Sequence, residues 1–185
     1  MKLLQQRGVN LFIGPLISSE LESCIEYANT QGLYIISPSS TSMALAKDDN
    51  VFRFMLNDEK QAKSLANYIS ELGYSYVQPV YRNDVYGQGL AEMFATKFEE
   101  LGGHCGNGVA YDTETTDFAA IAQTLNERIS SAGIQKKAIL LIAFDEYVQI
   151  MDQASGYPSL GEIRWFGTDS TALSALFSTN ANAAV

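Results

Sequence analysis

Residues 9–36 read VNLFIGPLISSELESCIEYANTQGLYII, and this stretch contains the alternation on which the fold depends. Val9 to Ile13 has the composition of a strand, and a Gly-Pro pair ends it. Ser19 and Glu22 form a capping-box pattern that opens a helix, and Gly32 ends that helix. Residues 33–36 are a second short apolar strand. A strand, a helix and a strand in this order predict a βαβ unit, which favours a parallel sheet.

The same alternation continues to the end of the chain. Further strands are expected at 51–55, 74–81, 109–111, 138–143 and 163–166, helices at 59–72, 90–101, 117–131 and 146–154, and short helical stretches from 43 and after 170. The pair Asn57-Asp58 can cap the helix that follows it, and Gly73 ends that helix. Pro79 falls inside a predicted strand, and because proline cannot donate to a β-ladder, we expect it at an edge or a bulge. The sequence therefore predicts an α/β fold.

The composition excludes several classes of protein. The chain has 185 residues, of which 46% are hydrophobic and 2 are cysteines, so it is not disordered, collagen-like or a disulfide scaffold. No apolar run, including the one at residues 138–143, approaches the roughly 20 residues that a membrane helix needs. The net charge of −9 repels polyphosphates, and nucleic acid is therefore not expected as a partner. The N-terminus lacks the apolar h-region of a secretory signal.

Residues that could carry catalysis or bind a cofactor are few. His104 is the only histidine, and because no nucleophile elbow accompanies it, we expect a surface side chain. His104 and Cys105 do not have metal-ligand spacing, and no metal site is predicted. Residues 87–89 match two thirds of a dinucleotide fingerprint, but Glu92 stands where the third glycine belongs, so no cofactor is expected. Cys24 and Cys105 are predicted to be buried free thiols.

Polar loops follow several of the predicted strands. In open α/β sheets, ligands bind beyond the carboxyl ends of the strands, where helix N-termini offer unpaired N–H groups. The loops 14–19 and 37–42 are rich in hydroxyls and could bind a carboxylate, although serine and threonine can equally cap helices there. Asp169 and Asp145 follow later strands and could hold an ammonium group, or act as caps or solvated charges. Tyr86, Phe144 and Tyr81 could form the walls of a pocket, with core packing as the alternative.

These loops resemble those of the type I periplasmic binding proteins, in particular the substrate-binding proteins of branched-chain amino acid ABC transporters. The segments that carry the resemblance occur in family order over nearly the whole chain. They are Phe12-Ile13-Gly14-Pro15 with Ser18-Ser19, Ile35-Ile36-Ser37-Pro38-Ser39-Ser40-Thr41, Val51-Phe52-Arg53, Asn83-Asp84-Val85-Tyr86-Gly87-Gln88-Gly89-Leu90, Asp117-Phe118 and Phe166-Gly167-Thr168-Asp169. No single segment is specific, but the ordered set is.

The resemblance implies two Rossmann-like lobes with parallel βαβ sheets, which close on an amino acid or a similar small zwitterion and deliver it to an ABC permease. The first lobe would bind the ligand carboxylate. The second would supply a tyrosine, an acid for the ammonium group and an aromatic contact. The matching positions are Ser18, Ser19, Ser39, Ser40 and Thr41 in the first lobe, and Tyr86, Phe144 and Asp169 in the second. The resemblance also implies a periplasmic or extracellular location and a protein that is not an enzyme.

The chain departs from this family because members are usually much longer, so it resembles a truncated member. Residues 1–57 match part of the first lobe, residues 58–178 match most of the second, and residues 179–185 form a tail that is expected to fray. An incomplete first lobe would leave a strand edge and apolar faces uncovered, so we expect self-association and weak or absent ligand binding. Two other functions stay open: a ligand-sensing domain of a receptor or regulator and, with less support, an enzyme on a doubly wound fold.

Overall fold

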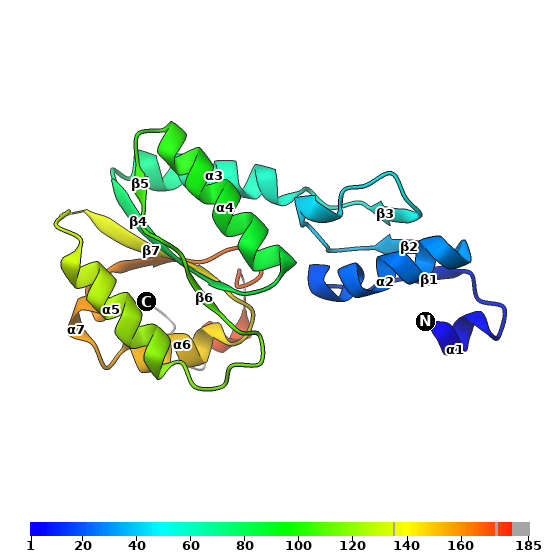
Figure 1. Ribbon diagram of the computed structural model, residues 1–185. Helices are drawn as coiled ribbons and strands as arrows, with labels where there is room; N and C mark the ends of the chain where they lie inside the picture. Colours follow the sequence, from blue (N-terminus) through cyan, green and yellow to red (C-terminus); the bar gives the residue numbers. More distant parts are fainter. Residues whose placement is uncertain (135, 173, 179–185) are drawn as a thin grey trace.

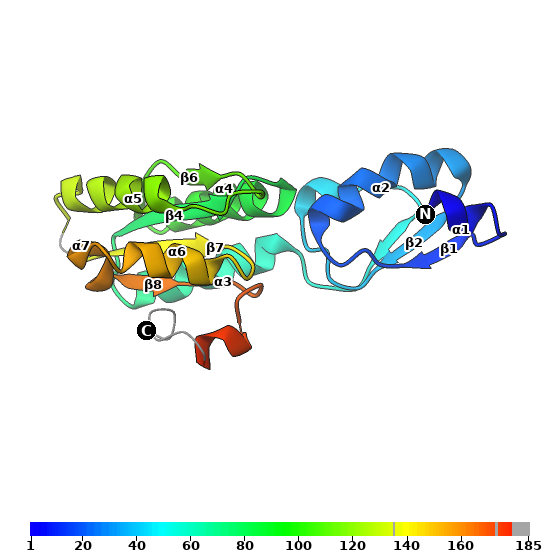
Figure 2. The same ribbon diagram turned by 90° about the horizontal axis from the view of Figure 1, so that it is seen from below.

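The computed structural model describes residues 1–134, 136–172 and 174–178. The chain forms two lobes, each built on its own parallel sheet (Figures 1 and 2). Between the two sheets the chain passes through residues 54–57, which belong to neither a helix nor a strand. The predicted α/β fold with two parallel sheets is confirmed, and the predicted tail at 179–185 lies outside the described residues.

The first lobe contains α1 (Lys2–Gln5), β1 (Leu11–Ile13), α2 (Ser18–Gln31), β2 (Tyr34–Ser37), the 3₁₀ helix η1 (Met43–Leu45) and β3 (Val51–Arg53). Its strands pair in parallel in the order β1-β2-β3. Phe12, Ile35 and Val51 lie opposite one another in this register, and they pack with Leu21 of α2. The βαβ unit that the sequence predicts is therefore confirmed.

The opposite face of the first sheet is largely uncovered by the described residues. Leu11, Ile13, Tyr34 and Phe52 share this face, and their exposed fractions lie between 48% and 80%. The rings of Tyr34 and Phe52 stack with centroids 6.4 Å apart. Parallel sheets are normally covered on both faces. The described part of the first lobe is therefore incomplete, as the resemblance predicts.

The second lobe is a doubly wound sheet with helices on both faces. Its elements are α3 (Asp58–Glu71), β4 (Tyr76–Arg82), α4 (Val85–Glu100), β5 (His104–Cys105), β6 (Val109–Tyr111), α5 (Ala119–Ser131), β7 (Lys137–Ile142), α6 (Tyr147–Ala154), α7 (Pro158–Gly161), β8 (Arg164–Phe166) and the 3₁₀ helix η2 (Ala175–Ser178). The strands run in the order β5-β4-β7-β8, and β6 also pairs with β4. Alternate residues of β7 face opposite layers: Leu140 packs with α3 and α4, and Ile139 with α5 and α6.

Side-chain caps open two helices of the second lobe, α3 and α4, but not α2 of the first lobe. The Asn57 side chain accepts a hydrogen bond from the Lys60 amide and caps α3, as predicted. Asp84 caps α4, which therefore begins at Val85, five residues before the expected Leu90. The predicted capping box of Ser19 and Glu22 is wrong. The helix begins at Ser18, and its N-cap residue is Ile17, whose apolar side chain cannot accept a hydrogen bond.

Pro79 lies in a central strand of the second sheet, so of the two expected positions the edge is wrong, whereas the partner strand bulges by one residue opposite Pro79, between the pairs Val77–Cys105 and Val80–Val109. Strand β4 pairs with β7 on one side and with β5 and β6 on the other. The Val77 carbonyl accepts from the Gly106 amide, and because parallel strands alternate, Pro79 points to that same side. There the partner strand is interrupted between Cys105 and Val109. The missing N–H of Pro79 therefore falls where no ladder bond is required.

The cysteines and the histidine are not gathered into a reactive cluster. Cys24 and Cys105 are free, half-buried and in different lobes, and burial raises the pKa of the Cys105 thiol to about 12. His104 is exposed, as predicted.

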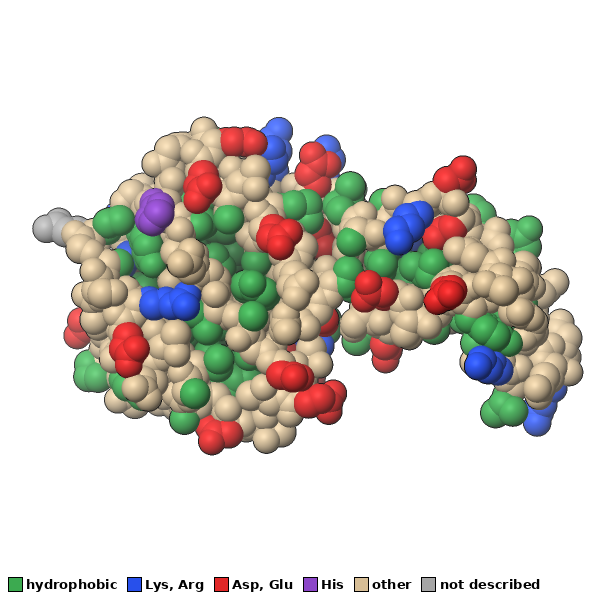
Figure 3. Space-filling model, in the orientation of Figure 1, with side chains coloured by type: hydrophobic (Ala, Val, Ile, Leu, Met, Phe, Trp, Pro, Cys, Tyr) green, Lys and Arg blue, Asp and Glu red, His purple; other side chains and the backbone are tan. Residues whose placement is uncertain are grey.

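No helix among the described residues is long and apolar enough to cross a membrane. Figure 3 shows acidic side chains spread over both lobes, in keeping with the net charge of −9.

Candidate functional site

A cavity of about 230 Å³ lies between the two lobes. Its lining residues are Leu16, Ile17, Ser18, Ser39, Thr41, Tyr86, Phe144, Asp169 and Ser170. Six of the eight predicted site residues are among them, and they come from both lobes. The two exceptions are Ser19, which lies half-buried in α2, and Ser40, which is buried behind the cavity. The fold thus brings the two hydroxyl loops of the first lobe opposite the acid and the tyrosine of the second.

The N-terminus of α2 faces this cavity. Leu16, Ile17 and Ser18 line it at the point where the helix begins. The first amides of a helix have no partner within the helix, and together with the helix dipole they carry a partial positive charge. No side chain caps this helix start. The wall of the first lobe is therefore suited to a carboxylate group of a ligand.

The hydroxyls beside this helix start hold the loop 37–42 in place. The Ser18 and Ser40 hydroxyls are hydrogen-bonded at 2.9 Å, and the Ser42 amide donates to the Ser18 hydroxyl. The Ser39 hydroxyl donates to the Leu16 carbonyl. Ser40 thus positions the loop and does not face the cavity, whereas Thr41 and Ser39 line it. None of these hydroxyls caps α2 or η1, so the capping alternative is wrong for this loop, and the binding role stays a prediction.

Tyr86 and Asp169 form the polar wall of the second lobe. The Tyr86 hydroxyl donates to Asp169 Oδ1 at 2.8 Å. It also lies 3.1 Å from the Thr168 hydroxyl and 3.2 Å from that of Ser170. Burial and the Asp169 carboxylate raise the pKa of Tyr86 above its ordinary value, so the tyrosine stays neutral and remains a donor. Asp169 itself is exposed to the cavity.

Gln61 holds Asp169 from the other side, and the sequence contained no signal for this role. Its side-chain amide donates to Asp169 Oδ1 and its carbonyl accepts from the Asp169 amide, each at 2.9 Å. Among the described residues, the hydrogen bonds to the Asp169 side chain all reach Oδ1. Oδ2 is therefore left for a ligand. A carboxylate held in this way can bind an ammonium group through a charge-assisted hydrogen bond.

Asp58 is a buried carboxylate at the junction of the lobes. It is the first residue of α3, its side chain is fully buried, and its amide donates to the Thr41 carbonyl at 3.1 Å. Among the described residues, no donor makes a well-aligned hydrogen bond to either of its carboxylate oxygens. Burial raises the pKa of Asp58 to about 6; the nearby Thr41 hydroxyl partly offsets this, and the Asp169 carboxylate adds to it.

The remaining wall of the cavity is apolar and aromatic. The rings of Tyr86 and Phe144 stack with centroids 5.6 Å apart and planes 4° apart. Leu16 and Ile17 complete this wall from the first lobe. Two other candidates from the sequence do not line the cavity: Asp145 is exposed outside it, and Tyr81 packs against the core layer of α3 and α4.

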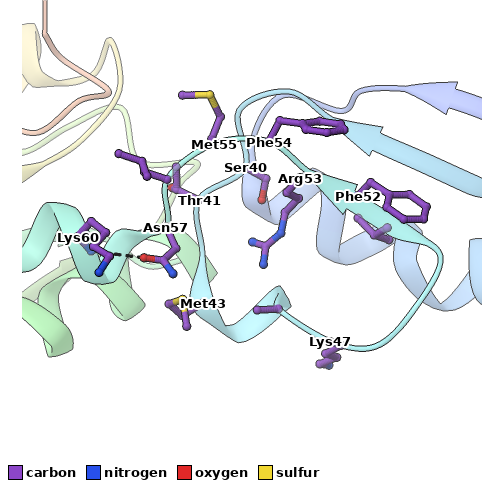
Figure 4. A pocket seen from close by; sticks show the side chains of 13 residues that line it. Ser40, Thr41, Met43, Lys47, Phe52, Arg53, Phe54, Met55, Asn57 and Lys60 are labelled. Carbon is purple, nitrogen blue, oxygen red and sulfur yellow. Dashed lines mark hydrogen bonds between the residues drawn. The ribbon is translucent and has the colours of Figure 1, made fainter.

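Figure 4 shows a second cavity of about 530 Å³ on the other side of the loop 37–42, beside β3. Ser40 and Thr41 line it together with apolar side chains that follow β3. Arg53 extends into it and donates to the Ser42 carbonyl. This contact supports the loop that carries Thr41. The loop is therefore a wall shared by the two cavities.

Two lobes on parallel sheets with a polar cavity between them form a two-lobed α/β fold with a candidate ligand site at the junction. Residues 1–184 match the family described as receptor family ligand binding region, and the chain belongs to this family, the type I periplasmic binding proteins. It is 28% identical over 179 residues to an uncharacterized protein of Methanocaldococcus jannaschii, a match that covers 93% of the chain and 43% of that protein. It is 26% identical over 141 residues to metabotropic glutamate receptor 4 of Rattus norvegicus, covering 73% of the chain and 15% of the receptor.

Solved structures agree with this assignment. The branched-chain amino acid transporter substrate-binding protein LivJ of Streptococcus pneumoniae, in complex with isoleucine, superposes with a TM-score of 0.73 at 26% identity, over 91% of the chain and 47% of LivJ. An extracellular ligand-binding receptor of Rhodopseudomonas palustris has the same fold, with a TM-score of 0.79 at 16% identity over 92% of the chain and 46% of that receptor. The chain thus spans less than half the length of these proteins. LivJ is described as a substrate-binding protein and the Rhodopseudomonas palustris protein as an extracellular ligand-binding receptor.

Proposed function

We propose that this chain is the ligand-binding part of a solute-binding protein for amino acid import, which works outside the cytoplasmic membrane with an ABC permease. Its ligand is a small zwitterion of the branched-chain type. One observation carries the proposal: the uncapped start of α2, with Ser39 and Thr41, lies across a single cavity from Asp169. An anion site and a cation site that face one cavity suit the two charged ends of an amino acid.

The cavity favours a small apolar side chain on that amino acid. Its volume of about 230 Å³ is below the roughly 300–1,000 Å³ of pockets for drug-sized ligands. Leu16, Ile17 and Phe144 supply apolar surface, and no Lys or Arg stands among its lining residues. A second carboxylate, as in glutamate, would therefore be desolvated without a cationic partner. This argues for leucine or isoleucine over glutamate.

Binding between the lobes would act by a population shift. A ligand that contacts Thr41 and Asp169 together has a higher affinity for the arrangement in which the lobes approach each other, and it moves the equilibrium by that difference. In a complete protein, a permease would recognise this arrangement. The chain spans less than half the length of its relatives, and its first lobe is incomplete in the described residues. We therefore expect this chain alone to bind weakly.

Sensing is the alternative function, and the similarity to metabotropic glutamate receptor 4 favours it. The binding geometry would be the same, but the readout would be a signalling domain and not a permease. The two functions call for different ligands. A glutamate sensor must accommodate a second carboxylate, whereas an importer of branched-chain amino acids need not. Ligand preference therefore separates them.

The proposal is tested by titrating the isotope-labelled chain with leucine, isoleucine and glutamate while NMR spectra are recorded. We expect leucine and isoleucine to shift the signals of Thr41, Tyr86 and Asp169 at millimolar concentrations, and glutamate to have little effect. Asp169→Asn should abolish these shifts, because it removes the carboxylate that faces the cavity. Asp145→Asn is the matched control, since it makes the same charge change at an exposed position outside the cavity.

Two outcomes would contradict the proposal. If none of the three amino acids shifts these signals, the cavity is not an amino acid site. If Asp145→Asn weakens binding as much as Asp169→Asn does, net charge and not the placed carboxylate is responsible. A preference for glutamate over leucine would instead support the sensing function.

A further inference from the structure

A buried ion-pair network lies behind the aromatic wall of the cavity. Arg82, the last residue of β4, is 7% exposed. Its Nε donates to Asp84 Oδ2 at 2.6 Å, and its Nη1 donates to Glu146 Oε1 at 2.8 Å. The Tyr111 hydroxyl donates to the same Glu146 oxygen at 3.0 Å. Burial and Glu146 raise the pKa of Tyr111, so Tyr111 stays neutral and remains a donor to Glu146.

The network reaches the cavity through a stack of planar groups. The guanidinium carbon of Arg82 lies 3.9 Å from the centroid of the Phe144 ring, a cation–π contact. Phe144 in turn stacks on Tyr86. The two carboxylates fix the plane and position of the guanidinium, because Arg donates in a rigid fork. Phe144 is therefore held between a fixed cation and the ring that carries the Tyr86 hydroxyl.

A second route joins Arg82 to Tyr86 through the backbone. One oxygen of Asp84 accepts from Arg82, while the other accepts from the amides of Tyr86 at 3.1 Å and Gly87 at 2.9 Å. A Cβ atom at Gly87 would lie 2.1 Å from the Arg82 carbonyl, which shows how closely the two turns pack. Arg82 thus orients the start of α4 as well as the ring of Phe144.

Neither Arg82 nor Glu146 lines the cavity. We propose that Arg82 is a positioning residue for ligand affinity: through Phe144 and Asp84 it sets the place of the Tyr86 ring, and so aims the Tyr86 hydroxyl at Asp169. This inference rests on the proposed function for its effect on binding, but the positioning itself does not. An ion pair of low exposure is weak evidence for a purely stabilising role, because such pairs can often be replaced by apolar residues at little cost in stability.

The test compares Arg82→Lys with Glu146→Gln and with the unrelated core variant Leu125→Ala. Lysine keeps the charge but lacks the planar fork that stacks on Phe144 and binds two carboxylates. Glutamine keeps the shape of Glu146 and removes its charge. Leu125 is fully buried in the layer of α5, away from the cavity, so its variant reports what destabilisation alone does. Each variant is measured by thermal unfolding, by NMR contacts between the Phe144 and Tyr86 rings, and by leucine titration.

We expect Arg82→Lys to weaken the Phe144–Tyr86 ring contacts without ligand and to lower leucine affinity about tenfold, the effect of losing one well-placed cation–π contact and its ordering. Glu146→Gln should have a smaller effect of the same kind. Leu125→Ala should lower the melting temperature and leave the ring contacts unchanged. Unchanged ring contacts in Arg82→Lys, or an equal change in Leu125→Ala, would overturn the inference. If the unmodified chain binds no leucine but Arg82→Lys still loosens the rings, the positioning role stands and the proposed function falls.

Discussion

At the scale of single residues, the two acids near the cavity differ because their surroundings differ. Asp169 is exposed to the cavity and receives hydrogen bonds from Tyr86 and Gln61. Asp58 is fully buried, and the nearby Thr41 hydroxyl offsets only part of the effect of that burial. A carboxylate removed from water without compensating donors holds its proton more tightly. The first acid is therefore suited to binding a cation, and the second makes the stability of the fold depend on pH.

The Asp58→Asn variant should show this dependence. The pKa of Asp58 is about 6 in the folded chain, against 3.8 for an ordinary aspartate. Between these values the folded state keeps a proton that the unfolded state has lost, so Asp58 lowers stability progressively as the pH rises from about 4 to 6. We expect Asp58→Asn to remove this loss and to raise the free energy of unfolding at pH 7 by roughly 1–3 kcal/mol. Denaturant unfolding at several pH values measures both effects.

Glu59→Gln is the matched control for this measurement. Glu59 is the next residue of the same helix turn, and it is exposed. The substitution makes the same change of charge near the helix start, where an acid contributes only a few tenths of a kcal/mol to about 1 kcal/mol. A stability gain in Glu59→Gln equal to that in Asp58→Asn would show that burial of Asp58 is not the cause.

At the scale of elements, the places where helices end follow directly from glycine positions. Helix α2 ends at Gly32, which has φ +63°, and the chain turns there into β2. A residue with a Cβ atom is strained in this left-handed conformation. The sequence therefore predicted both this helix end and that at Gly73, which has φ +80°.

We expect Gly32→Ala to destabilise the chain by about 1 kcal/mol, because it adds backbone strain without any clash. A Cβ atom at Gly32 would meet nothing within 4 Å. Gly133→Ala is the control: a Cβ atom there also meets nothing within 4 Å, and its φ lies outside the left-handed region. Thermal unfolding should show a lower melting temperature for the first variant only. Equal melting temperatures would mean that the end of α2 does not depend on the left-handed residue.

The sequence predicted most strands and helices but not the pairing around β4. The expected strand contained a proline, and proline suggests an edge. Only the tertiary arrangement shows that the break between β5 and β6 lies opposite Pro79. The short elements α1, β5 and α7 were also missed, because two to four residues are too few to display a period.

At the scale of the whole molecule, most of the exposed large apolar side chains among the described residues lie in the first lobe and just after β3. The apolar residues on and next to the uncovered face of the first sheet include Ile13 at 80% and Phe54 at 77% exposed. Contiguous apolar surface of this kind marks an interaction site in a folded protein. The large exposed side chains of the second lobe, such as Leu72 and Leu101, are fewer and less exposed, at 40% and 47%.

We therefore expect this chain to self-associate through the first lobe, in a manner that depends on concentration. Sedimentation velocity should show species larger than the monomer, and the double substitution Phe52→Ser with Phe54→Ser should shift the distribution towards the monomer. Leu72→Ser with Leu101→Ser removes apolar surface from the second lobe and should have little effect. A compact monomer at all concentrations would contradict the prediction, as would equal effects of the two double variants.

The amino-acid sequence by itself determined the α/β class, the order of the strands and helices along the chain, and the loops in which ligand-binding groups had to be sought. These properties depend on local periodicity and on turn residues, which neighbours in the chain specify. Only the tertiary structure decided which groups meet. It placed Ser40 behind the cavity and Thr41 in it, brought Gln61 to Asp169 across 108 residues, and joined Arg82 to Tyr86 through Phe144. Such contacts link residues distant in sequence, and no local pattern records them.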